Sequence, residues 1–157
     1  MTKIYPLPVK KNKRGELVAS LSVTRQYRQI MEEVMEAHAE NVGVFESNEA
    51  EELADVITCC ITRLNILNDG EKNFVEYVSE LLTEAERGYT EPEDFYTDLA
   101  VTVMKGYYRC SYTFGECKLL SDIIVMCEKR LERMGFKRGN LYAAVNAKNV
   151  VRGYLEN

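Results

Sequence analysis

The long interval without proline, from Gly15 to Glu91, is the feature that most constrains the fold. Proline removes a backbone donor and clashes with the preceding helical turn, so its absence permits helices of many turns. The three prolines stand outside this interval, at positions 6, 8 and 92. Apolar residues inside it recur with the 3.6-residue period of a helix. We therefore expect an all-α fold.

The same periodicity divides the chain into a short extended N-terminal arm, residues 1–22, and a bundle of five to six helices. Two prolines and the basic run 10–14 favour an extended arm. Residues 16–23 are compatible with a short strand or with the entry into the first helix. The predicted helices span about 24–41, 49–68, 71–87 and 115–134, and two more begin near residues 92 and 140.

Composition limits the class of protein. The 157 residues suffice for one domain with a buried core, and 46% apolar and 29% charged residues are typical of a soluble protein. No apolar run approaches the roughly 18 residues that span a bilayer, so we expect no membrane partner. Five cysteines, two of them adjacent at Cys59 and Cys60, predict free thiols and a cytoplasmic location.

The net charge of −5 argues against nucleic acid as a partner, because phosphate backbones attract basic surfaces. An acidic protein can still bind a polyphosphate when divalent cations neutralise both sides. The single histidine, His38, disfavours a histidine-dependent catalytic triad.

Four acidic residues form two pairs at helical spacing. Glu33 and Glu36 are three apart on the first predicted helix, and Glu52 and Asp55 repeat that spacing on the second. Residues three apart share a face, and two antiparallel helices bring such faces together. Converging carboxylates repel one another unless a cation lies between them, and their oxygens suit Mg²⁺ or Mn²⁺. We therefore expect these four residues to bind a metal.

A solvated acidic face is the alternative interpretation. Glu36 lies opposite the apolar stripe of its helix, and Glu33 lies about 120° from the centre of that stripe. Glu52 and Asp55 instead begin a stripe that continues through Cys59. Ionised carboxylates at the edge of a buried surface need a partner.

The segment Glu32-Glu33-Val-Met-Glu36, followed after fifteen residues by Glu52-Leu-Ala-Asp55, resembles the E-E-x-x-E…E-x-x-D signature of the MazG-like all-α NTP pyrophosphohydrolases. This superfamily includes dimeric dUTPases and phosphoribosyl-ATP pyrophosphatases. The resemblance covers residues 24–67. It implies Mg²⁺-dependent hydrolysis of a nucleoside triphosphate to monophosphate and pyrophosphate, with Glu33, Glu36, Glu52 and Asp55 as ligands. It also implies catalytic roles for Glu32 and Glu33, with Glu32 orienting the attacking water.

A second resemblance lies near the C-terminus, where Lys148-Asn149-Val-Val-Arg152 is similar to the Lys-Asn…Arg segment that often closes such chains. It implies that these three named residues bind substrate phosphates. Lys148 and Arg152 are four apart and share a helical face, which suits phosphate oxygens. Two solvated cations are the alternative. Residues 69–114 match nothing in the family, which leaves the nucleobase open.

The chain also contains an internal similarity. Residues 52–64 align without a gap on residues 119–131, with six of thirteen positions identical, including Asp55 with Asp122. A degenerate repeat would give two helical hairpins related by a pseudo-twofold axis, of which only the first keeps all four acids. A chance match between two amphipathic helices is the alternative.

We thus expect a nucleotide pyrophosphohydrolase of nucleotide-pool control or house-cleaning. The alternatives are a dUTPase-like enzyme that also accepts diphosphates, and a non-catalytic helical interaction module. Because the second helix is apolar around nearly its whole circumference, we expect helices to pair across subunits in a dimer or tetramer.

Overall fold

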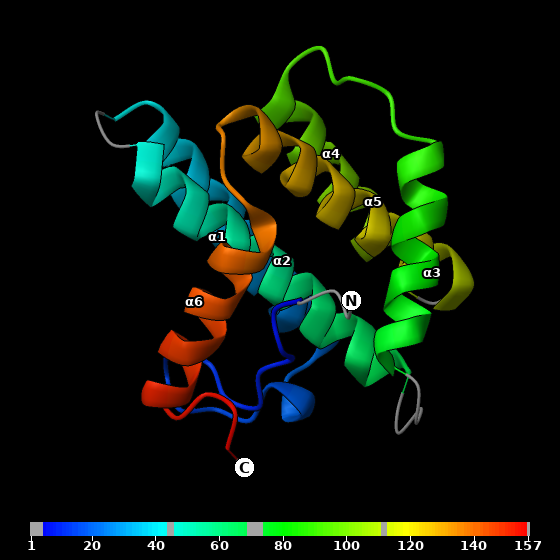
Figure 1. The fold of residues 1–157 in the computed structure, drawn as a ribbon. Coiled ribbons are helices and arrows are strands. Elements are labelled where there is room, and N and C mark those ends of the chain that lie inside the picture. Colours follow the sequence, from blue (N-terminus) through cyan, green and yellow to red (C-terminus); the bar gives the residue numbers. More distant parts are fainter. Residues whose placement is uncertain (1–4, 44–45, 69–73, 111–112, 157) are drawn as a thin grey trace.

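A computed structural model describes residues 5–43, 46–68, 74–110 and 113–156. Within these ranges the protein contains one short 3₁₀ turn, six α-helices and no strand, which confirms the all-α prediction (Figure 1). The helices are α1 (Val23–Asn41), α2 (Glu46–Leu67), α3 (Phe74–Arg87), α4 (Phe95–Tyr108), α5 (Thr113–Arg133) and α6 (Arg138–Val151).

The helix limits differ from the predicted ones by two or three residues at several starts, and α2 begins at Glu46, three residues before the expected start. Helix α4 begins at Phe95, after an extended Asp94 at its N-cap, and leaves Pro92 outside the helix. Helix α6 begins at Arg138, two residues before the expected start. Gly135, with a φ of 86°, follows the end of α5 in the left-handed region that favours glycine. The expected start of the third helix, at residues 71–73, lies outside the described residues.

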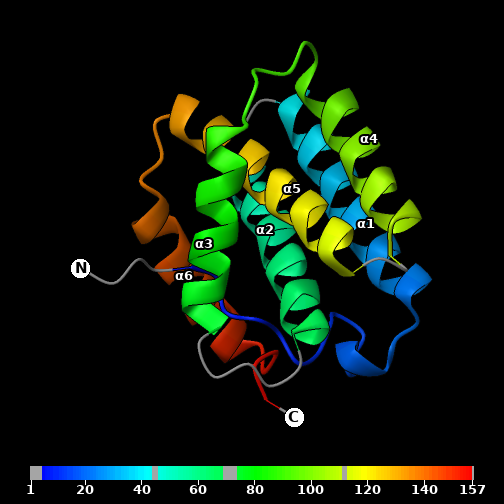
Figure 2. The ribbon, with the colours of Figure 1, turned by 90° about the vertical axis from the view of Figure 1, so that its right-hand side faces the viewer.

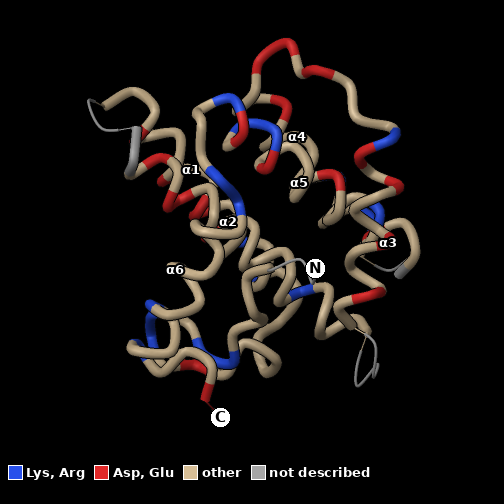
Figure 3. The backbone as a smooth tube through the Cα atoms, in the orientation of Figure 1, with Lys and Arg blue, Asp and Glu red and all other residues tan. Residues whose placement is uncertain are grey.

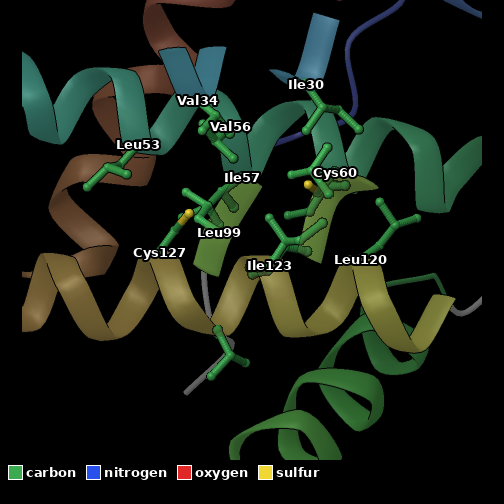
Figure 4. Close-up of a cluster of buried hydrophobic side chains, with 14 of the residues drawn as sticks. Ile30, Val34, Leu53, Val56, Ile57, Cys60, Leu99, Leu120, Ile123 and Cys127 are labelled. Atoms are coloured by element: carbon green, nitrogen blue, oxygen red, sulfur yellow. The ribbon is translucent and has the colours of Figure 1, made fainter. Parts of the chain in front are cut away.

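Helices α2 and α5 pack against each other at the centre of the bundle. Helices α1 and α6 contact α2, whereas α3 and α4 contact α5, and α1 also touches α4 (Figure 2). Buried side chains from α1, α2, α4 and α5 interlock between them (Figure 4). Leu53, Val56 and Ile57 of α2 are wholly buried in this cluster.

The burial of α2 corrects one expectation. Its apolar side chains are covered by α1 and α5 of the same chain, so this helix is not available to pair across subunits. A homo-oligomer remains a prediction that must rest on another surface. No helix in the described part of the chain is both long and apolar enough to cross a membrane.

A buried ion pair joins α2 to α5 near one end of their contact. The Arg63 guanidinium donates to Glu116 at 2.8 Å, and Tyr27 of α1 donates its hydroxyl to the same carboxylate at 2.6 Å. Glu116 is completely buried. Three helices are therefore joined through one carboxylate, and the guanidinium and hydroxyl that donate to it offset the free-energy cost of burying its charge.

An equivalent arrangement lies at the opposite end of the same helix pair. Arg130 of α5 donates to Glu49 of α2 at 3.2 Å, and Tyr96 of α4 donates its hydroxyl to Glu49. A shift of 67 residues places Glu49 on Glu116 and Arg63 on Arg130. When α2 is aligned with α5, the residues of the pair Glu49–Arg130 thus correspond to those of the pair Glu116–Arg63. These contacts agree with a degenerate repeat, which itself remains a prediction.

The N-terminal arm lies against the body of the protein. The backbone amides of Lys10 and Lys11 donate to the carbonyl of Tyr154, and Val9 donates to the Thr62 hydroxyl. Residues 16–22 contain no strand and lead into α1: a single bridge joins Lys11 to Leu17, a 3₁₀ turn covers residues 18–20, and the Ser22 side chain caps the helix that begins at Val23. Figure 3 shows basic residues of the arm and of α6 at the same end of the molecule.

Candidate metal centre

Three of the predicted ligands converge between α1 and α2. One carboxylate oxygen each from Glu33, Glu36 and Glu52 lies within 4.8 Å of the other two. Glu33 is buried, Glu52 is half-buried and Glu36 is exposed. Helical periodicity places both Glu33 and Glu36 on the solvent side of α1. In the structure Glu33 is instead buried against α2, whereas Glu36 is exposed.

The fourth predicted ligand, Asp55, lies one turn after Glu52 on α2 and outside this tight group. Burial, followed by the charge of Glu52, raises the pKa of Asp55 to about 6. The cations Lys148, Lys13 and Arg152 act in the opposite direction. Asp55 is therefore electrostatically part of the same site, although its oxygens stand further away.

Two carboxylate oxygens in the cluster have no donor. No described residue donates a hydrogen bond to Glu33 Oε2 or Glu52 Oε2, and both atoms are buried. Contacts between two carboxylates become hydrogen bonds only when one holds a proton. A buried oxygen without a donor costs stability, and a hard divalent cation satisfies several at once. The donor set, all carboxylate oxygen, therefore suits Mg²⁺ or Mn²⁺.

The proton affinities reflect the same crowding. Burial, then the charge of Asp55, raises the pKa of Glu33 to about 7. Burial and hydrogen bonds shared with Glu36 and Glu33 raise the pKa of Glu52 to about 8. For Glu36, burial is outweighed by the contact with Glu52 and by the charge of Lys13, so its pKa is lowered. Without a cation the cluster thus retains protons near neutral pH.

A basic residue that the sequence did not indicate lies at this site. Lys13, on the arm, places its ammonium 3.2 Å from Glu33 Oε1 and 3.4 Å from Glu36 Oε2. Burial opposes its charged form, but the two carboxylates outweigh burial and raise the pKa of Lys13. A monovalent cation of the chain itself thus neutralises part of the cluster. Helical periodicity carries no signal for this contact, because the arm is not helical.

A cavity of about 270 Å³ opens beside the carboxylates. Its walls come from α1, α2, the arm and the C-terminal segment. Among the lining residues are Gln26, Gln29, Glu32, Glu33, Glu36, Asp55, Thr58, Cys59, Thr62, Arg63, Lys13, Asn149, Arg152 and Tyr154.

The predicted catalytic acid Glu32 also lines this cavity but does not join the three-carboxylate group. Its carboxylate lies 3.4 Å from Arg28 Nε, one turn earlier on α1. Its position lets it meet a molecule in the cavity while Glu33 faces the cluster. A role for Glu32 in catalysis remains a prediction.

The predicted phosphate-binding residues separate into two groups. Asn149, which is buried, and Arg152 both line the cavity. Lys148 instead points to Glu51, 3.7 Å away, and is not part of the cavity wall. Lys148 is nevertheless close enough for its charge to lower the pKa of Asp55.

The end of the cavity away from the carboxylate cluster is lined by polar side chains that hydrogen-bond to one another and to the backbone. Gln26 and Arg63 lie two helical turns from Glu33 and Asp55, which is about 10 Å along each helix axis. Arg63 Nη1 donates to the Gln26 side-chain oxygen at 3.1 Å, and Gln26 Nε2 donates to the Leu21 carbonyl at 3.0 Å. Sequence reasoning missed both residues because their partners are distant along the chain.

No family model matches the sequence, and no curated protein or solved structure matches it either.

Proposed function

We propose that this protein is a Mg²⁺-dependent nucleoside triphosphate pyrophosphohydrolase that releases a monophosphate and pyrophosphate. The observation that carries the proposal is the pair of buried carboxylate oxygens without donors, Glu33 Oε2 and Glu52 Oε2, beside a cavity of about 270 Å³. The resemblance of the acidic motif to the MazG-like signature supports the same function.

Each group of residues has a distinct task in this proposal. Glu33, Glu36, Glu52 and Asp55 would hold Mg²⁺, which neutralises phosphate charge and activates water for attack. Glu32, on the cavity wall, orients that water and accepts its proton. Asn149 and Arg152 donate hydrogen bonds to phosphate oxygens, with Lys148 adding charge from outside the cavity.

Hydrolysis of a panel of nucleoside and deoxynucleoside triphosphates tests the proposal. We expect release of pyrophosphate only with Mg²⁺ or Mn²⁺, and a higher melting temperature in either metal. Asp55→Asn should lose this activity while keeping its helical circular dichroism. The matched control is Asp122→Asn, which changes the aligned aspartate of α5, far from the carboxylate cluster, and should remain active.

Two outcomes would reject the enzyme. The first is a protein that neither gains thermal stability from millimolar metal nor releases pyrophosphate, which would favour a non-catalytic interaction module. The second is a fully active Asp55→Asn variant, which would show that the site lies elsewhere.

The reciprocal ion pairs of α2 and α5 favour one variant of this function. They agree with a double-hairpin chain, and such an architecture suits a dUTPase-like enzyme that also accepts diphosphates. Products formed from dUTP, dCTP and dUDP distinguish the two: hydrolysis of dUDP to dUMP supports this variant, whereas cleavage restricted to triphosphates supports the first.

A further inference from the structure

Helix α4 exposes apolar side chains along one face. Val101, Met104 and Tyr108 are 47%, 52% and 82% exposed. Their spacing of three and four residues aligns them in a single stripe along the helix. An exposed apolar stripe of this kind is typical of an interaction surface.

A groove runs beside this stripe. It has a volume of about 840 Å³, lies between α3 and α4 above α5, and includes Val101 and Lys105 in its wall. Phe114, at the start of α5, also lines the groove and is 85% exposed. Apolar surface therefore continues from α4 to α5.

The first half of the chain lacks most of this stripe. A shift of 69 residues places Tyr27 on Tyr96, and it places Glu32 of α1 on Val101 of α4. The same shift places Glu33 on Thr102 and Glu36 on Lys105, so the groove beside α4 lacks the carboxylates of the metal centre. The fold therefore does not require an apolar residue at the position of Val101, and Ala39 likewise stands where α4 has Tyr108, whereas Met104 has an exposed counterpart in Met35.

The charges beside the stripe are arranged with opposite signs at its two ends. Asp98 and Lys105 are seven residues apart on the same flank of α4, about 10 Å along the axis. Both line the groove, and in the described part of the chain neither forms an ion pair, although Asp98 accepts a hydrogen bond from the Asp94 amide. Two such helices packed antiparallel to each other therefore have complementary charges, because the acidic end of one lies beside the basic end of the other.

We propose that a second copy of this chain docks on the α4 face, about a twofold axis that passes near Val101. In this arrangement Asp98 of each copy faces Lys105 of the other, and the stripes of Val101, Met104 and Tyr108 form the apolar centre. Parallel docking of the two helices places Asp98 beside Asp98 and is opposed by like charge. The interface is independent of the metal centre and of the proposed reaction.

Light scattering coupled to size exclusion, and sedimentation equilibrium, test this interface on the full chain. The wild type should show twice the chain mass of 18.0 kDa. Met104→Glu should give a folded monomer, because it buries a charge within the apolar contact. Its matched control is Met35→Glu, at the aligned position of α1, where the side chain is also exposed (65% against 52% for Met104), and this variant should remain dimeric.

Charge exchange tests the antiparallel arrangement. Lys105→Asp alone should weaken the dimer about tenfold or more, because it opposes two aspartates. Asp98→Lys alone should weaken it similarly, and the double variant should recover wild-type affinity. A monomeric wild type at 100 µM (about the level at which a weak dimer forms), a dimeric Met104→Glu variant, or a double variant as weak as the single ones would each overturn the proposal.

Discussion

Glu52 and Glu33 make the stability of the metal-free protein depend on pH. Their pKa values in the folded chain are about 8 and 7, against a value of 4.5 for an unperturbed glutamate. Between pH 4.5 and 8 the folded state therefore binds more protons than the unfolded state, so these groups stabilise the fold at low pH and lose that contribution as the pH rises.

We predict that replacing Glu52 by Gln reduces this loss. In EDTA, the melting temperature of the wild type should fall further between pH 5.5 and 8 (the window in which these groups titrate, to about one pH unit) than that of Glu52→Gln. Glu51→Gln, which removes an exposed neighbouring carboxylate, should behave as the wild type. Parallel melting curves for wild type and Glu52→Gln across this range would contradict the assignment.

Lys13 competes with a metal for the same carboxylates. Its ammonium lies 3.2 Å from Glu33 Oε1, so its positive charge opposes a divalent cation bound to the same cluster. We predict that Lys13→Ala binds Mn²⁺ about two- to fivefold more tightly, as expected for loss of a partly exposed ion pair. Calorimetric titration measures this difference. Lys10→Ala, on the same arm, is the control, and weaker binding by Lys13→Ala would show that Lys13 assists the metal.

The cluster of carboxylates was predictable in part because its spacing is local. Glu33 with Glu36, and Glu52 with Asp55, share helical faces by geometry alone, and the helix order brings the two faces together. Lys13 was not predictable, since its place depends on where the arm crosses the bundle. That crossing is fixed by backbone hydrogen bonds to Tyr154, at the other end of the chain.

At the scale of the helices, the periodicity of apolar residues and the positions of turn-forming residues predicted most helix ends to within a few residues. Both signals are local: α1 ends near Gly43 and α5 near Gly135, as expected, and Gly135 has the positive φ of a left-handed helix end. Buried polar partners are not local. Arg63 and Glu116 stand 53 residues apart, and neither position reveals from the sequence that its charge is buried.

The ion pairs between α2 and α5 should contribute unequally to stability. The Arg63 side chain is only 7% exposed, whereas that of Arg130 is 28% exposed. Arg63→Met leaves the Glu116 carboxylate buried without its cation, which should cost about 3–5 kcal/mol. Urea denaturation should show a smaller loss for Arg130→Met, because water can reach that end. An equal or larger loss for Arg130→Met would contradict this account.

Across the whole molecule, two aromatic contacts correspond to each other in the two halves of the chain, as the two ion pairs do. The His38 and Tyr96 rings lie 4.9 Å apart, and those of Tyr27 and Tyr107 lie 5.5 Å apart. A shift of 69 residues places His38 on Tyr107 and Tyr27 on Tyr96, so one contact becomes the other. The α1–α2 hairpin and the α4–α5 hairpin thus hold each other through matching pairs of contacts, as expected for two halves about a pseudo-twofold axis.

If the halves correspond in this way, the groove beside α4 occupies the place of the metal centre and can be given its ligands. Asp122 already stands where Asp55 stands, and Thr102, Lys105 and Leu119 correspond to Glu33, Glu36 and Glu52. We predict that the triple variant with glutamate at those three positions binds twice as many Mn²⁺ ions per chain as the wild type.

Electron paramagnetic resonance of free Mn²⁺ counts the bound ions. The matched control carries glutamine at the same three positions, which keeps side-chain size but supplies no charged ligand, and should bind as the wild type. A carboxylate at position 105 also opposes dimerisation through α4, so the variant and the wild type can differ in oligomeric state. Bound ions are therefore counted per chain and not per oligomer. A folded triple variant with the wild-type number of ions would show that the two grooves differ in backbone geometry, and that the halves correspond only in their packing contacts.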